Sequence, residues 1–358
     1  MQREITQELS PELRANSQIP AKSRKGERIT ALDFTKGALV LIMVLYHWVN
    51  YFIGPQWEYY RYLRFLTPSF IFITGFMISN VYLSKYDATD PRLPKRLFVR
   101  GLKLLALFVV LNMARILLVP VLSGGSVAAS QSGLTNLFAI FITGNVSVLP
   151  GKVVSFSILV PISYLLILSG ALILPYRVFR PTFQVVGVSC LLTALTLDFI
   201  GLPSWNLEAL TIGLLGVAAG FIPIARINKF VQHPYLLGAA YLCYIAAITV
   251  WNVPFSLLIV GVCLSVMAIY LAGSSDGKPG RIRAEFILLG KYSLFGYISQ
   301  IAILQFLRAG FRHVDLGPSG LGLTFCAAFF LTILSVEVVD RARAKATSMD
   351  RLYKAVFA

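Results

Sequence analysis

The sequence predicts an all-α integral membrane protein with about ten transmembrane helices, because the chain is apolar, carries few charges and repeats long apolar runs. Of its 358 residues, 57% are hydrophobic and 13% are charged, whereas a soluble protein carries about 25% charged residues. A spanning helix needs about 20 mostly apolar residues. The predicted spans are 37–54, 67–83, 101–122, 153–174, 183–200, 207–225, 235–251, 254–272, 285–307 and 319–339.

The segments outside these spans divide the chain into three parts. Residues 1–27 are polar without periodicity, which predicts a disordered cytoplasmic tail. Residues 28–339 form the predicted transmembrane domain. Residues 340–358 form a basic cytoplasmic tail in which basic and apolar residues alternate, as in a short amphipathic helix on the anionic lipids of the inner leaflet.

The distribution of basic residues predicts the orientation in the membrane. With the N-terminus inside and 134–149 outside as a non-spanning segment, the cytoplasmic stretches carry 26 Lys and Arg and the external loops carry 5. Such an excess is typical of the cytoplasmic side. We therefore expect a multi-pass protein of the cell (inner) membrane with both termini cytoplasmic. The net charge of +16 then reflects topology and anionic lipids, and no nucleic-acid partner is expected.

Charged and titratable residues are concentrated in the first span. Lys36 lies at its cytoplasmic end, and His47 lies eleven residues later in its outer half. Three helical turns are close to eleven residues, so the two side chains share a face about 16 Å apart. Asp33 lies one turn before Lys36 and is positioned to orient it. An imidazole titrates near neutrality, which suits a general base. In the alternative interpretation neither residue has a catalytic role: His47 is a hydrogen-bonded histidine inside the helical bundle, and Lys36 marks the cytoplasmic end of the helix.

Several motifs of the chain, in order, resemble the membrane-bound acyltransferases of the acyltransferase-3 kind. Lys36 and His47 match the opening motif of a basic residue, ten others and a histidine. Residues 68–76 resemble the Phe-rich second helix of that family. Residues 207–221 are similar to its later Gly-rich helix, and 290–300 look like its Gly-x-x-Ser-Leu-x-x-Tyr motif. The resemblance covers about 28–339. Periplasmic glucan succinyltransferase-like and heparan-alpha-glucosaminide N-acetyltransferase-like branches fit equally well.

The resemblance implies acyl transfer across the membrane, from a cytoplasmic acyl-CoA to a hydroxyl or amine of an extracytoplasmic glycan or similar acceptor. Acetyl and succinyl-like groups both stay open as the acyl group. His47 would act as general base or acyl carrier, assisted by Lys36 and Asp33. Cationic side chains bind phosphates, so the predicted donor-binding residues are the basic ones near the cytoplasmic side and two from the late motif: Lys36, Lys95, Arg96, Arg100, Tyr292 and Ser293. No metal site is expected.

Acceptor binding is predicted for charged residues on or near the external side. Arg61 and Arg64 lie in the first external loop, and Arg115 lies in the outer half of the third span. An arginine within the membrane needs a partner or a ligand. Asp198 and Glu208 flank an external turn and are candidate partners for Arg115. A structural ion pair and an acceptor site are equally compatible with these three residues.

A different class of protein also fits the sequence. A multi-span transporter or flippase for a small or lipid-linked substrate would have many spans, few charges and an intramembrane arginine. That class predicts paired broken helices in two halves of the chain. Only the acyltransferase is expected to bind acyl-CoA through Lys36 or Arg96.

Overall fold

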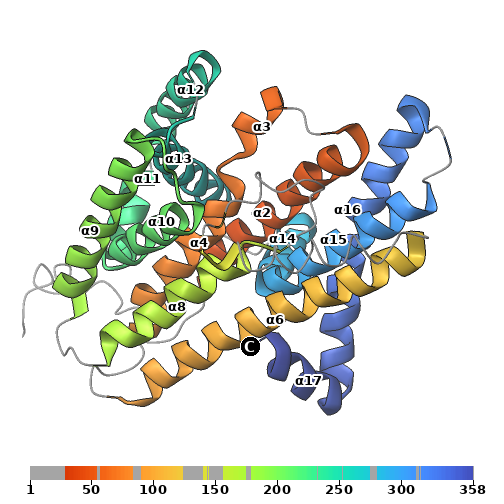
Figure 1. The fold of residues 1–358 in the computed structure, drawn as a ribbon, viewed down its shortest axis with the longest axis horizontal. Helices are drawn as coiled ribbons and strands as arrows, with labels where there is room; N and C mark the ends of the chain where they lie inside the picture. The colour runs from red at the N-terminus through yellow and green to blue at the C-terminus, as the bar shows by residue number, and fades with distance from the viewer. Residues whose placement is uncertain are drawn as a thin grey trace, which may run out of the picture.

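The protein is an all-helical bundle in its described parts, as seen in a computed structural model (Figure 1). The structure describes residues 29–54, 57–83, 90–123, 140–142, 144, 156–174, 179–231, 233–251, 253–274, 280–311, 314 and 316–357. No strand occurs within these ranges. The predicted disordered tail 1–27 lies outside them, and so does most of the predicted non-spanning segment 134–149.

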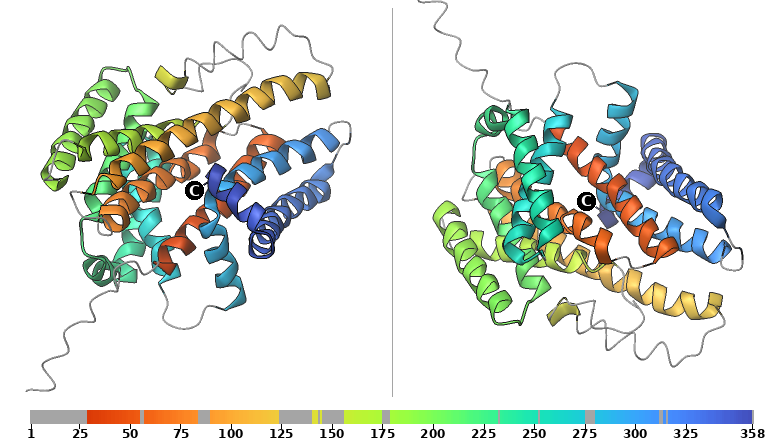
Figure 2. Two further views of the ribbon diagram at one scale, coloured as in Figure 1. Left: turned by 90° about the horizontal axis from the view of Figure 1, so that it is seen from below. Right: turned by 90° about the horizontal axis from the view of Figure 1, so that it is seen from above.

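The described residues form the following helices in chain order. Their bounds are α2 Thr30–Trp48, η1 Val49–Ile53, α3 Trp57–Leu63, α4 Leu66–Met77, η2 Ile78–Tyr82, α6 Arg92–Ser123, α8 Leu159–Ile173, α9 Phe179–Phe199, α10 Trp205–Gly220, α11 Ile224–Val231, α12 Pro234–Val250, α13 Phe255–Gly273, α14 Arg281–Lys291, α15 Ser293–Gly310, α16 Gly317–Lys345 and α17 Thr347–Phe357. Figure 2 shows α2 and α4 near the centre, with α6 and α9 toward the outside.

Helix α2 is the central element, since α4, α13, α14, α15 and α16 all pack against it. Its closest approach is to α14, where glycines on both helices remove the side chains from the contact. A methyl group at Gly37 would overlap the backbone carbonyl of Phe286, and one at Gly290 would overlap the carbonyl of Asp33. Small residues bring membrane helices together in this way. The contact fixes Asp33 and its neighbour Lys36 against the end of α14.

Glycines also bring α4 and α10 into backbone contact. Methyl groups at Gly75, Gly213 or Gly216 would meet atoms of the partner helix or of α8 at overlapping distances. Ser79 adds a hydrogen bond, donating from Oγ to the carbonyl of Val217 at 2.7 Å. Satisfying a hydroxyl inside an apolar bundle removes the cost of burying it.

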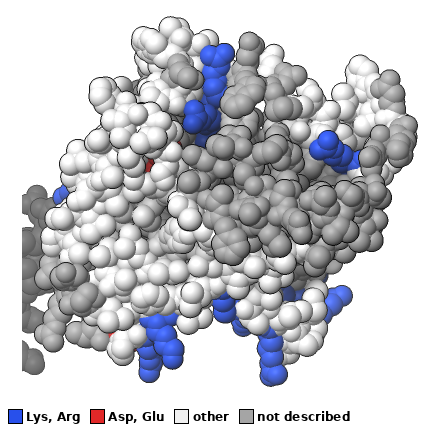
Figure 3. All heavy atoms as spheres, in the orientation of Figure 1, with Lys and Arg blue, Asp and Glu red and all other residues white. Residues whose placement is uncertain are grey.

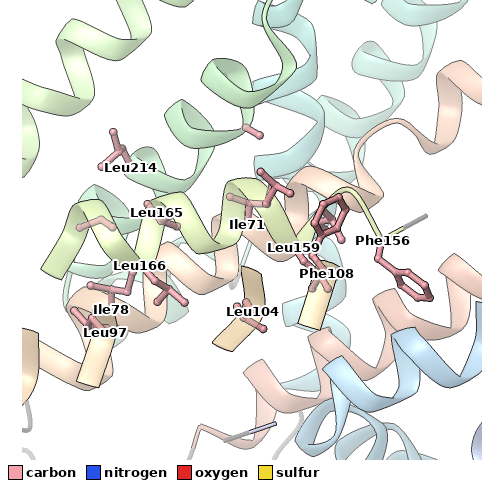
Figure 4. Packing of buried hydrophobic residues seen from close by; sticks show 14 of the residues in the cluster. Ile71, Ile78, Leu97, Leu104, Phe108, Phe156, Leu159, Leu165, Leu166 and Leu214 are labelled. Carbon is pink, nitrogen blue, oxygen red and sulfur yellow. The ribbon is translucent and has the colours of Figure 1, made fainter. Parts of the chain in front are cut away.

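The largest buried cluster lies where α8 crosses α4, α6 and α10. Leu159, Leu165 and Leu166 of α8 contact side chains from all three of these helices (Figure 4). The partners labelled there are Ile71, Ile78, Leu97, Leu104, Phe108 and Leu214, with Phe156 just before α8. Each is at most 7% exposed. This packing holds α8 beside α6, and the two helices form one wall of the cavity described below.

The prediction of a multi-pass helical protein is confirmed, but the count of ten spans is not. Among the described residues, six helices are long and apolar enough to cross a membrane: Thr30–Ile53, Tyr59–Tyr82, Arg92–Ala114, Pro181–Phe199, Phe255–Gly273 and Gly317–Lys345. The predicted spans near 153–174, 207–225 and 235–251 are apolar helices of 15, 16 and 17 residues. These lengths fall short of the roughly 20 residues of a spanning helix. The orientation of the termini stays a prediction.

The predicted span 285–307 is not one straight helix. It consists of the end of α14 and most of α15, which meet at 93° around Tyr292. Counted as one broken span, the pair raises the number of candidate spans to seven. The bend turns the beginning of α15 into the interior, because α14 stays locked against α2 by Gly37 and Gly290.

The distribution of charge over the surface agrees with a membrane protein. On the face shown in Figure 3, most visible Lys and Arg side chains project from the upper and lower margins. The predicted basic tail 340–358 forms the end of α16 and the separate helix α17. Ala346, in an extended conformation (φ −126°, ψ 117°), separates the two helices.

Candidate functional site

Helix α2 carries both Lys36 and His47 on one continuous helix, as the sequence predicts. The Lys36 ammonium lies 2.7 Å from the Asp33 carboxylate, and the Asp33 side chain is 5% exposed. The predicted orientation of Lys36 by Asp33 is therefore present as a contact. Its part in any reaction stays a prediction.

A cavity with a volume of about 180 Å³ begins beside Lys36. Its walls come from α2, α4, η2, α6, α8, α14, α15 and α17, elements that are far apart in the sequence. Side chains at one end are cationic or phenolic, namely Lys36, Tyr82, Arg100, Lys291 and Tyr353. The remaining lining is mostly apolar, including Ile73, Ile158 and Leu294. We call this space the Lys36 cavity.

The cationic end of the Lys36 cavity is held by contacts around its rim. The Arg100 guanidinium donates to the hydroxyl of Tyr82. Lys291 Nζ lies 3.1 Å from the Asp340 carboxylate, and Tyr292 donates to the same carboxylate at 2.5 Å. These partners fix the positions of Arg100 and Lys291 while both still line the cavity.

The beginning of α15 adds a further positive feature. Ser293 and Leu294 line the cavity, and the first intrahelical hydrogen bond runs from the N–H of Gly296 to the carbonyl of Tyr292 at 2.8 Å. The first turn of a helix leaves backbone N–H groups without intrahelical acceptors, and its dipole is positive there. This end of the cavity therefore combines cationic side chains with a helix N-terminus, an arrangement suited to an anionic group.

The Lys36 cavity reaches Tyr297, a neighbour of His47, whereas His47 itself does not line the cavity. Tyr297 lines the cavity, and its ring centroid lies 6.3 Å from that of His47. Phe156 meets the same tyrosine edge-on at 5.9 Å. His47 Nε2 is buried and has no hydrogen-bond partner among the described residues. An unpaired buried nitrogen is costly unless a ligand or solvent serves it.

The other predicted donor-binding residues lie at the rim or outside it. Arg96 is exposed and its guanidinium carbon lies 5.9 Å from the centre of the Tyr82 ring. Lys95 is exposed and does not line the cavity. Tyr292 is 2% exposed and packs behind the cavity wall, whereas Ser293 lines the cavity. The structure thus brings together Lys36, Arg100 and Ser293.

Arg61 and Arg64 contact the backbone at the end of α12 and in its connection to α13, respectively. Arg61 donates to the carbonyl of Thr249 at 2.9 Å, and Arg64 donates to the carbonyl of Val253 at 3.0 Å. Carbonyl groups at a helix C-terminus lack intrahelical donors. Arg61 therefore fastens α3 to the end of α12, and Arg64 fastens the residues after α3 to the connection between α12 and α13. Their predicted binding of an acceptor stays a prediction.

Asp198 and Glu208 lie near Arg64. Glu208 is 7% exposed and within electrostatic range of Asp198 and Arg64. The Asp198 carboxylate accepts from the N–H of Phe255 at 3.4 Å. Arg115 lies in α6, but its side chain is outside the described part of the structure. The expected pairing of these carboxylates with Arg115 stays a prediction.

Of the residues that line the cavity, only Lys36, Arg100 and Ser293 were selected from the sequence, and the polar and aromatic residues at the cationic end include four that were missed, namely Tyr82, Lys291, Tyr353 and Phe357. Tyr82 and Lys291 sit at helix ends, where a tyrosine and a lysine are ordinary membrane anchors. Tyr353 and Phe357 belong to α17, at a distance of more than 300 residues along the chain from α2. The amphipathic pattern of 340–358 was the available signal, and it predicted a membrane surface contact instead.

One comparison with known proteins bears on the site. Residues 28–128 match a protein family described as heparan-alpha-glucosaminide N-acetyltransferase, catalytic. The matched segment contains α2 with Lys36 and His47, and α6 with Arg100. No curated protein and no solved structure matches the chain.

The fold and this match, which covers less than a third of the chain, support one class of protein. The helices are those of a multi-pass membrane protein, and the match supports an acetyltransferase-like membrane enzyme. The family that matches corresponds to one of the branches that the sequence motifs resemble. The match does not extend to the acyltransferase-3 family.

Proposed function

We propose that the protein transfers an acetyl group from cytoplasmic acetyl-CoA to an amine or hydroxyl of an extracytoplasmic acceptor such as a glycan. The observation that carries this proposal is the Lys36 cavity, which is cationic at one end and reaches Tyr297, the neighbour of His47, at the other. The name of the matching family favours acetyl over succinyl and an amine over a hydroxyl.

The donor would enter by the cationic end. The phosphates of CoA would bind Lys36, Arg100 and Lys291 together with the first turn of α15, since ammonium, guanidinium and backbone N–H groups all bind phosphate. Exposed Arg96 and Lys95 would attract the anionic donor toward this mouth. Asp33 would hold the Lys36 ammonium in place through the 2.7 Å ion pair.

The narrow apolar part of the cavity suits the pantetheine arm and its thioester. The thioester carbon would lie beside Tyr297, one ring away from His47. Unpaired His47 Nε2 would take the proton of the acceptor amine or hydroxyl as the acceptor attacks the thioester carbonyl. The C–S bond breaks, a C–N or C–O bond forms, and the CoA thiolate takes up a proton. His47 returns to the neutral form by releasing its proton.

The acceptor would approach from the opposite end of α2. Arg61, Arg64, Arg115, Asp198 and Glu208 remain the proposed residues for acceptor binding, although Arg61 and Arg64 also contact the backbone at the end of α12 and in its connection to α13. Orientation with both termini in the cytoplasm of an inner membrane would put the donor mouth inside, where acetyl-CoA is available.

Purified protein with labelled acetyl-CoA and a panel of amino sugars and oligosaccharides tests the proposal. Replacing His47 by Ala should lower the rate of acceptor acetylation by about 10² to 10⁴, the usual contribution of a general base. His233, exposed and at the beginning of α12, is the matched control, and His233→Ala should retain the full rate. Equal rates for His47→Ala and the parent protein would refute the role of His47.

The bend between α14 and α15 also favours a transporter, because broken helices whose ends face the interior form substrate sites in many transporters. Among the described residues this bent pair has no counterpart in the first half of the chain. Reconstituted protein that moves a solute but neither binds nor cleaves acetyl-CoA would establish the transporter instead.

A further inference from the structure

The C-terminal helix α17 folds back over the cationic end of the Lys36 cavity. Tyr353 and Phe357 of α17 line the cavity together with Lys36 and Arg100. The ring of Phe357 meets Phe295 of α15 at 5.8 Å, and the ring of Tyr353 meets Tyr292 at 5.3 Å. Figure 1 shows α17 turning back from the lower end of the long helix α16, and α17 contacts both α16 and α6. The last helix of the chain is thus part of the cavity mouth.

Polar contacts on the outside of the mouth hold α17 in this position. Arg343 at the end of α16 donates to the Asp350 carboxylate at 2.6 and 3.0 Å. Lys354 lies 2.6 Å from the same carboxylate, but this ion pair is within α17. Lys103 of α6 donates to the backbone carbonyl of Lys354 at 3.5 Å. These contacts are near the surface, where ion pairs contribute little, so they can break without unfolding the bundle.

Tyr353 is not available as a stacking platform in this arrangement. Phe357 stacks on its ring with centroids 5.0 Å apart and an interplanar angle of 28°. The Arg343 guanidinium carbon lies 4.1 Å from the centre of the same ring. With a phenyl ring and a guanidinium both packed against it, the Tyr353 ring is held in place at the mouth of the cavity.

We propose that α17 is a lid that closes the cytoplasmic mouth of the Lys36 cavity and must swing away before the nucleotide part of a donor can enter. The proposal rests on the proposed function for the identity of the donor, but the movement itself does not depend on it. Extended Ala346, between α16 and α17, is the natural hinge. A cavity of about 180 Å³ accommodates a slender acyl chain, and the three phosphates and purine of CoA require the space that Tyr353 and Phe357 occupy.

A cysteine reporter inside the cavity tests the lid directly. Ser293 lines the cavity, so Ser293→Cys is introduced into full-length protein whose four cysteines, Cys190, Cys243, Cys263 and Cys326, are replaced by Ala. The protein is purified in detergent, and the rate of reaction with a charged water-soluble maleimide is measured. Ile282→Cys, at a 77% exposed site of α14 that does not line the cavity, is the control reporter.

Opening the lid should raise the reaction rate at Ser293→Cys and leave the rate at Ile282→Cys unchanged. Phe357→Ala combined with Tyr353→Ala removes the two aromatic side chains from the mouth. This double variant should raise the reaction rate at Ser293→Cys at least about tenfold, as expected where local opening limits access. Asp350→Asn, which weakens the ion pairs of Asp350 with Arg343 and Lys354, should raise the rate at Ser293→Cys about two- to fivefold. A reporter rate that stays constant in both variants, with an unchanged control rate and a monodisperse protein, would overturn the lid.

Adding acetyl-CoA separates this proposal from the proposed function. Protection of Ser293→Cys by acetyl-CoA in the double alanine variant supports both. Faster labelling without protection by acetyl-CoA supports the lid and counts against acetyl-CoA as the ligand of the cavity. Protection by acetyl-CoA together with no effect of either lid variant on labelling rejects the lid and leaves the donor site standing.

Discussion

Two groups of cationic residues in this protein have different surroundings. Lys36, Arg100 and Lys291 converge on a cavity from α2, α6 and α14. Arg61 and Arg64 also lie at the end of the bundle, but their guanidinium groups contact the backbone carbonyls of Thr249 and Val253. The two groups are alike in charge and differ in what they face.

The contrast shows that the surroundings of a cation indicate its role better than its charge. A guanidinium bound to the carbonyls at a helix end satisfies acceptors that the helix itself cannot serve. Arg100 contacts Tyr82 and Lys291 contacts Asp340, but both cations also line the cavity. They can therefore bind an anion that enters it. We therefore expect the first group to control ligand binding and the second to control stability.

The largest effect is expected from Gly290→Ala, because a methyl group there overlaps the backbone carbonyl of Asp33. Separating α14 from α2 would move Lys291 away from Lys36, so that the cations no longer converge on the cavity. We expect a loss of stability of about 3 kcal/mol or more, at the upper end for overpacked sites, measured as thermal unfolding in detergent. Gly238→Ala, where added atoms meet open space, should leave the unfolding temperature nearly unchanged. A stable Gly290→Ala protein would show that the close contact is not required.

A smaller effect, confined to ligand binding, is expected from Arg100→Ala. A hydrogen bond to a charged group contributes about 1.5 to 3 kcal/mol, so the Kd for acetyl-CoA should rise about 10- to 100-fold in isothermal calorimetry. The hydroxyl of Tyr82 loses its guanidinium partner but lies at the rim, so the unfolding temperature should change little. An unchanged Kd would remove Arg100 from the proposed donor site.

Arg64→Ala is expected to lower the stability of the protein without weakening the binding of acetyl-CoA, the reverse of the result expected for Arg100→Ala. Loss of the 3.0 Å hydrogen bond to Val253 should cost about 1 kcal/mol of stability and leave the Kd for acetyl-CoA unchanged. Thermal unfolding and calorimetry on the same preparation measure both quantities. Weaker acetyl-CoA binding by Arg64→Ala without loss of stability would show that Arg64 controls ligand binding, as proposed for the cations of the cavity.

The sequence was sufficient to predict the helical membrane class and the first helix. Long apolar runs and an eleven-residue spacing are local properties, and α2 indeed carries both Lys36 and His47. The bend at Tyr292 was missed because no proline marks it within 285–307. It depends on the contact of Gly290 with the backbone of Asp33, more than 250 residues away along the chain, which a hydropathy pattern does not contain.

The candidate site was predicted only in part for the same reason. The sequence indicated Lys36, Arg100 and Ser293, which line the cavity. It gave no means to tell that Arg64 would meet the backbone carbonyl of Val253 or that Tyr353 would reach the same cavity as Lys36. Charge and residue type are visible in a sequence, whereas the partner of a charge depends on the packing of distant helices.

The smallest effect is expected from pH, and it concerns the ion pairs of Asp350 in α17, which lie outside the lining of the cavity. Lys354 and Arg343 lower the pKa of the Asp350 carboxyl below its usual value of 3.8. A lowered pKa means that the ion pair contributes fully above the usual value and is lost only as the pH falls through the lower value in the folded protein. Closure of α17 should therefore not change between pH 6 and pH 8.

The ratio of labelling rates at Ser293→Cys and Ile282→Cys measures this, since the ionisation of the thiol affects both reporters. We expect the ratio to stay constant within about twofold from pH 6 to pH 8. High salt, which screens exposed ion pairs, should raise it slightly at either pH. A ratio that changes steeply between pH 6 and pH 8 would mean that a group titrating near neutrality holds the lid, in place of Asp350 with Arg343 and Lys354.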